Sequence, residues 1–86
     1  MSKKEIVNQI KKRLTELGVT KGGCQNLNIT LPSNNKLAWV SYTQIQISVK
    51  VKEPLYRNKR YGLYSKDVDL TLLELILNNL KEKVKN

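Results

Sequence analysis

Hydrophobic and polar residues alternate along residues 37–52, LAWVSYTQIQISVKVK. Successive side chains of a β-strand point to opposite faces, so this alternation predicts one long strand with an apolar and a polar face. The strand exceeds the usual length of about five or six residues, and we expect a bend or bulge near residues 41–43, where the apolar row turns polar. The residues predicted to face the core are Leu37, Trp39, Ser41, Thr43, Ile45, Ile47, Val49 and Val51.

The segments on either side of this strand predict two more strands. Residues 26–31 alternate with the same period, and their three apolar residues are expected to face inward. Pro32 and the polar residues after it predict a turn, so these first two strands form a hairpin. Pro54 ends the long strand, because proline cannot donate a ladder hydrogen bond. We expect a loop after it and then a third strand over residues 60–64.

The first helix is predicted over residues 2–17. Its apolar residues recur at spacings of three and four, which places them on one face of a helix. Ser2 and Glu5 have the spacing of a capping box at its start. Gly18 follows the last apolar residue and is typical of a helix C-terminus.

The second helix is predicted over residues 65–86, with Ser65 or Asp67 as its N-cap. Its apolar arc is wider than one face in the first half of the helix. The surplus residues either cover the sheet and the first helix or form a partner surface, for which an isologous homodimer is the simplest arrangement. The residues of this predicted partner surface are Val68, Leu72 and Leu75.

The predicted order is helix, three strands, helix, which defines an α+β fold (αβββα). A chain of 86 residues forms a single small domain with one core, here residues 1–86. Both helices are expected to pack on the apolar face of a three-stranded antiparallel sheet. The polar face of the sheet then stays uncovered.

The charge of the chain points to a polyanionic partner. Sixteen Lys and Arg residues against seven Asp and Glu residues give a net charge of +9. A basic surface of this kind is typical of nucleic-acid binding. A coding bias towards lysine, asparagine, isoleucine and leucine is the alternative explanation of the lysines, but it does not account for the excess of base over acid.

The residue types that the chain lacks or contains only once exclude several classes of function. The chain has no histidine and one cysteine, Cys24. Histidine is the commonest general base and metal ligand, so we expect no catalysis, no cofactor and no metal site. A single cysteine excludes an internal disulfide. No apolar run approaches the ~20 residues of a membrane span. The N-terminus has no signal-peptide pattern. We therefore expect a cytoplasmic protein without enzymatic activity.

The candidate binding residues lie on the polar face of residues 37–52 and in the segment that follows. Three cations and three tyrosines occur in residues 56–64 without an acid. Lysine and arginine contact phosphates, and tyrosine offers a plane on which an unpaired base can stack. The sequence therefore predicts a small protein that binds DNA or RNA. The predicted binding residues are Tyr42, Gln44, Gln46, Lys50, Lys52, Tyr56, Arg57, Lys59, Arg60 and Tyr61.

A second hypothesis belongs to another class of function. A short, basic chain of this composition also suits an accessory protein of a phage or mobile element that binds a host protein. Such a protein would use the apolar edge of the last helix or meet an acidic partner.

Overall fold

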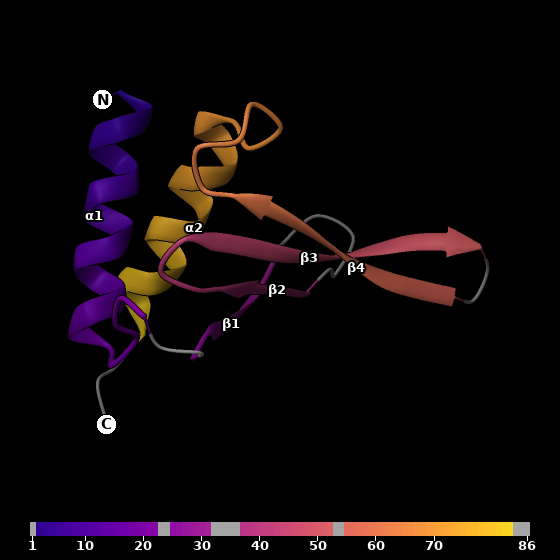
Figure 1. Cartoon of the computed structure of the whole chain (residues 1–86), viewed down its shortest axis with the longest axis horizontal. Helices are drawn as coiled ribbons and strands as arrows, with labels where there is room; N and C mark the ends of the chain where they lie inside the picture. The colour runs from indigo at the N-terminus through magenta and orange to yellow at the C-terminus, as the bar shows by residue number, and fades with distance from the viewer. Residues whose placement is uncertain (1, 23–24, 32–36, 53–54, 84–86) are drawn as a thin grey trace.

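The computed structural model describes residues 2–22, 25–31, 37–52 and 55–83. Helices lie at both ends of the chain with strands between them, so the fold is α+β, as predicted (Figure 1). The four strands form one antiparallel sheet in the order β1-β2-β3-β4, one strand more than predicted. The elements are α1 (Lys3–Glu16), β1 (Leu27–Thr30), β2 (Leu37–Val40), β3 (Gln44–Lys52), β4 (Leu55–Gly62) and α2 (Leu70–Glu82).

The prediction of a single strand over residues 37–52 is wrong, because the chain reverses at residues 41–43 and forms the β2–β3 hairpin. Ser41 holds this turn. Its N–H and its Oγ both donate to the carbonyl of Gln44, at 2.9 and 3.1 Å. The N–H of Gln44 donates back to Ser41 Oγ at 3.3 Å. The polar interruption in the apolar row therefore marks a reversal of the chain, where a bend was expected.

The turn inverts the faces that were expected for β2. Ala38 and Val40 are fully buried, whereas Leu37 is 44% exposed and Trp39 lies half-buried on the opposite face. All four residues of β2 are apolar, so either set could face the core, and only the position of the turn decides between them. The expected face of β3 is confirmed, since Ile45 is buried.

β4 is longer than the predicted third strand. It begins at Leu55 and pairs with β3 as far as Gln44, so residues 55–59, expected as a loop, belong to the sheet. Among the described residues, β3 pairs with β2 through residues 45–47. Beyond Ile47 the two strands continue as a two-stranded hairpin that extends past the helices (Figure 1).

Both predicted ends of α1 are confirmed. Ser2 is the N-cap, and its Oγ accepts a hydrogen bond from the N–H of Glu5 at 3.2 Å. At the other end Gly18 has φ of 95°, a left-handed conformation that glycine adopts without steric cost. The N–H of Val19 then donates to the carbonyl of Leu14 at 2.8 Å, which completes a Schellman motif.

The closing helix is shorter than the predicted residues 65–86, of which 84–86 lie outside the described chain. Its N-cap is Asp69, whose Oδ1 accepts from the N–H of Leu72 at 2.9 Å. Ser65 closes a separate turn, since its Oγ accepts from the N–H of Asp67 at 3.2 Å. Ser65, Asp67 and Asp69 are all favourable caps, so the sequence does not choose among them.

One apolar core joins both helices to a single face of the sheet, as predicted. Within the described chain no polar or charged side chain is buried. The helices cover the sheet side that carries Ile29, Ala38, Val40 and Ile45. No described helix covers the opposite side, which we call the open face. No described helix has the length and apolar character that crossing a bilayer requires.

Candidate nucleic-acid interface

Four side chains, one from each strand, form a row across the open face of the sheet. Trp39 of β2 is paired with Asn28 of β1 on one side and with Gln46 of β3 on the other. Gln46 is paired in turn with Arg60 of β4. Residues directly opposite one another in an antiparallel sheet share a face, so the four side chains lie side by side. We call Asn28, Trp39, Gln46 and Arg60 the cross-strand row.

A hollow of ≈ 600 Å³ lies over three members of this row, Trp39, Gln46 and Arg60. Lys21 and Asn26, from the segment before β1, and the β2–β3 turn line its other sides. The hollow therefore combines an indole, two cations and amide groups. None of the described residues that line it is acidic.

The charges of the described residues are segregated between sheet and helices. The four strands contain no Asp or Glu, whereas every described acid lies on α1, on α2 or in the turn before α2. The cations of the sheet lie in β3 and β4. A polyanion that approaches the open face consequently meets positive charge without a competing carboxylate on the strands. The strand cations are Lys50, Lys52, Arg57, Lys59 and Arg60.

Tyr42 lies at the rim of the hollow, in the β2–β3 turn, and it contacts α1. Lys11 Nζ lies 5.3 Å from the centroid of the Tyr42 ring and 5.1 Å from that of Tyr64. Such cation–π contacts are attractive and hold the turn against the helix. Tyr42 thus has a structural contact in addition to its predicted place at the site.

The basic, tyrosine-rich segment does not form one surface, because it lies on a strand and its residues alternate between faces. Tyr56 and Arg60 share the open face, since Arg60 is paired with Gln46. Arg57, Lys59 and Tyr61 lie on the other face, opposite Val49, Ile47 and Ile45. The residues predicted as one binding loop are therefore divided between two sides of the sheet.

Tyr61 packs against the core on the side of the sheet that the helices cover. It is half-buried against the core, and Lys59 Nζ lies 5.5 Å from the centroid of its ring. Tyr56, by contrast, is 60% exposed. Of these two tyrosines, Tyr56 is the one with a free surface for a ligand.

The remaining predicted site residues occupy β3. Gln44 lines the hollow beside Gln46. Position 50 is paired with Tyr56, but the Lys50 side chain lies outside the described part of the structure. Lys52 is exposed and paired with Leu55, past an irregularity of the ladder between residues 50 and 52.

The residues predicted as a partner surface on the last helix differ in exposure. Val68 is fully buried in the core, so it offers no surface to a partner. Leu72 and Leu75 are half-buried and pack against the same core. The homodimer stays a prediction that concerns these two leucines.

Sequence reasoning missed Trp39 and Lys21. A single strand over residues 37–52 predicts that Trp39 faces inward. Lys21 lies in a loop whose position relative to the sheet is set by the tertiary fold. The signal that could have placed Trp39 is the run Ser41-Tyr42-Thr43, which is long enough to reverse the chain.

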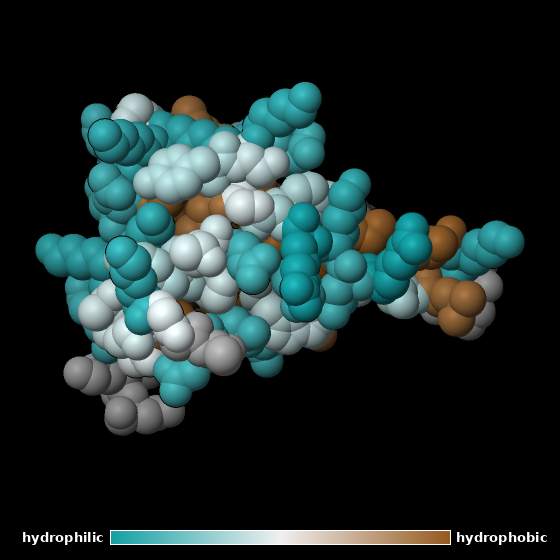
Figure 2. Space-filling model, viewed as in Figure 1, coloured by the Kyte–Doolittle hydropathy of each residue, from teal (hydrophilic) through white to brown (hydrophobic). Residues whose placement is uncertain are grey.

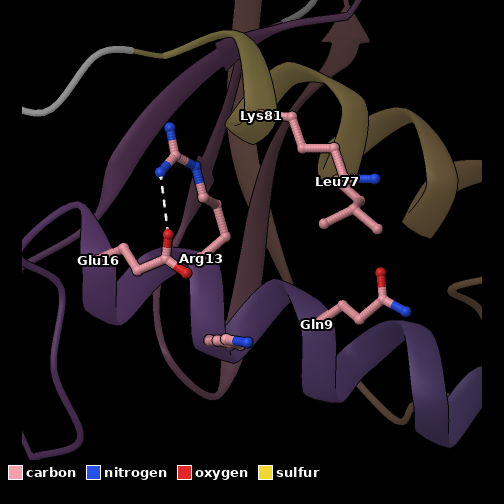
Figure 3. Close-up of a pocket in the computed structure, with 6 residues that line it drawn as sticks. Gln9, Arg13, Glu16, Leu77 and Lys81 are labelled. Carbon is pink, nitrogen blue, oxygen red and sulfur yellow. Dashed lines mark hydrogen bonds and ion pairs between the residues drawn. The ribbon is translucent and has the colours of Figure 1, made fainter.

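A second hollow of ≈ 580 Å³ lies between α1 and α2 (Figure 3). Arg13 borders it, and its guanidinium contacts both α2 and Glu16. Its Nε donates to the carbonyl of Leu80 at 2.9 Å, another N–H donates to the carbonyl of Lys83, and Nη1 pairs with Glu16 at 3.2 Å. These contacts satisfy carbonyls at the end of α2, so this cluster is part of the helix packing.

The described residues contain no group of three or more His, Cys, Asp or Glu side chains that could hold a metal ion. Cys24 lies outside the described residues. No protein-family model, curated protein or solved structure matches the chain.

Proposed function

We propose that this protein binds single-stranded nucleic acid on the open face of its sheet and has no catalytic activity. The observation that carries the proposal is the cross-strand row on a sheet without acids. Trp39 lies in the same hollow as Lys21 and Arg60. An aromatic plane combined with cations is the usual composition of a single-strand site.

Lys21 of the hollow and the four residues of the cross-strand row each have a part in this proposal. The guanidinium of Arg60 and the ammonium of Lys21 contact phosphates. The indole of Trp39 stacks with a base, and the amides of Asn28 and Gln46 have donors and acceptors for a base edge. A base inside a duplex has both faces covered by its neighbours, so stacking on Trp39 favours an unpaired base.

The absence of catalysis is supported by the composition of the hollow. General acid–base chemistry requires titratable groups that converge on a substrate. The lining residues that the structure describes include no acid, and the chain has no histidine. Phosphate contact, stacking and hydrogen bonding are the chemistry that these side chains supply.

The test uses the fluorescence of Trp39, which is the only tryptophan of the chain. Titration with an unlabelled single-stranded oligonucleotide should quench this fluorescence, because a stacked base contacts the indole directly. The quenching should shift to higher ligand concentration as salt is raised, because binding releases counterions from phosphates.

Arg60 and Arg57 provide a matched pair of variants, since they are the same residue type on the same strand with opposite faces. Arg60→Ala should weaken the binding of a single strand and lower its salt slope by about 0.7, the value of one phosphate contact. Arg57→Ala should change the affinity for a single strand and the salt slope much less. A folded protein whose fluorescence does not respond to any single strand at low salt would refute the proposal.

A further inference from the structure

The outer part of the β3–β4 hairpin has no support from the rest of the described chain. Within the described part of the chain, residues 48–52 pair only with residues 55–58, because the described pairing of β2 with β3 ends at Ile47. We call these two segments the β-ribbon. Its apolar side chains are exposed, Val51 of β3 at 47% and Leu55 of β4 at 63%, whereas Ile45 of β3, before the β-ribbon, is buried.

The β-ribbon exposes apolar side chains between cations. Figure 2 shows hydrophobic side chains near the free end of this hairpin, with hydrophilic ones around them. Lys52 and Arg57 are exposed on it, and none of its described residues is acidic. Two strands without further support are marginally stable in water, so this apolar surface contributes little to the fold. Its charge complements a polyanion.

We propose that the β-ribbon enters the major groove of duplex DNA adjacent to the single strand held on the open face. The inference rests on the proposed function and extends it, because the preferred ligand becomes a junction between duplex and single-stranded DNA. Arg57 and Lys52 contact phosphates along the groove. Val51 and Leu55 contact apolar groups on the groove floor, such as the methyl group of thymine.

The dimensions of the β-ribbon agree with this ligand. The major groove of B-form DNA is about 12 Å wide and 8.5 Å deep, and it admits a two-stranded β-ribbon. Residues 48–52 rise about 3.3 Å each, so they reach about 16 Å beyond the rest of the sheet. The major groove of A-form RNA is deep and narrow and does not admit side chains for reading. The duplex part of the ligand is therefore DNA.

The experiment compares four ligands: a DNA hairpin with a single-stranded tail, the tail alone, the hairpin with a blunt end, and the RNA counterpart of the tailed hairpin. Affinities are measured by fluorescence anisotropy at several salt concentrations. The tailed DNA hairpin should bind more tightly than the tail alone and more tightly than its RNA counterpart.

Two variants then distinguish the contact of the β-ribbon with the duplex from the contact of the open face with the single strand. Lys52→Ala combined with Arg57→Ala should abolish the advantage of the tailed hairpin and lower its salt slope by up to about 1.8, with the tail alone bound as before. Arg60→Ala should weaken the binding of both ligands. Circular dichroism melting confirms that each variant is folded.

The outcomes distinguish this inference from the function on which it rests. If the tail binds but the duplex adds nothing, the β-ribbon inference is wrong and the proposed function stands. If no ligand binds, both are wrong. Sedimentation of the free protein tests whether a second copy covers the β-ribbon: a dimer that the substitution Leu55→Ser dissociates would also overturn the inference.

Discussion

At the scale of single residues, Trp39 is the aromatic side chain on which the proposed single-strand binding depends. Trp39→Ala should weaken single-strand binding by about 1–3 kcal/mol, the value of one base stacked on an aromatic ring. The salt slope should stay the same, because no charge is removed. Anisotropy of a labelled oligonucleotide measures both quantities. Trp39→Tyr should retain most of the affinity, since it keeps a ring.

Leu37 supplies the control, because it is apolar and lies on the same strand and face as Trp39. Leu37→Ala should leave the affinity close to that of the wild type. If both substitutions weaken binding equally, the loss reflects general disturbance of the sheet and the stacking role is wrong.

Arg13 is the residue that joins the two helices by hydrogen bonds. Its guanidinium donates to the carbonyls of Leu80 and Lys83 at the end of α2. Arg13→Ala should cost about 1.5–3 kcal/mol of unfolding free energy, the range for hydrogen bonds that involve a charged group. In a domain of this size, each kcal/mol lowers Tm by about 4–8 °C. Thermal melting followed by circular dichroism measures the effect.

Lys12, the exposed neighbour of Arg13 on α1, is the control for this prediction. Lys12→Ala should change the unfolding free energy by less than about 0.5 kcal/mol, as is usual for surface positions. Equal losses in the two variants would show that Arg13 contributes only as a surface charge.

At the scale of elements, the β2–β3 turn determines which residues of β2 face the core. Ala38→Asp should unfold the domain, because it buries an unpaired carboxylate in a small core. Leu37→Asp should leave cooperative melting intact, since Leu37 is 44% exposed. A single strand over residues 37–52 would give the opposite result, so melting of the two variants separates the two arrangements directly.

β4 shows how strand geometry divides a sequence cluster. Arg57, Lys59 and Arg60 are close in sequence, but Arg60 lies on the open face and the other two on the helix side. A triple replacement of these residues would mix two surfaces and would not identify either contact. Single substitutions on opposite faces, compared on ligands with and without a duplex, assign each residue to its own surface.

At the scale of the whole molecule, the net charge of +9 acts on stability and on binding in opposite directions. Like charges that gather on the sheet repel one another, and salt screens this repulsion. Raising salt from about 50 mM to 200 mM should therefore raise Tm of the free protein. The same change should weaken nucleic-acid binding, because counterion release contributes less. A neutral osmolyte of matched concentration controls for effects other than screening. A Tm that falls with salt would contradict the argument.

The sequence alone determined the features that depend on neighbouring residues. Periodicity predicted both helices and the α+β class, and Ser2 and Gly18 marked the ends of α1 correctly. Caps and helical faces arise within a few residues of the chain, so local sequence is sufficient for them. The excess of cations, and with it the prediction of a polyanionic partner, likewise came from composition.

Only the tertiary structure decided which face of β2 is buried and which side chains meet. All four residues of β2 are apolar, so either alternating pair could face the core. The pairing of β2 with β3 selected the arrangement in which Trp39 faces outward. The same pairings brought Lys21, Trp39 and Arg60 to one hollow, although they lie far apart in the sequence. Strand pairing is a contact between distant residues, and a shift of one residue exchanges the two faces. Alternation along one strand therefore cannot specify the site, whereas the register of four strands does.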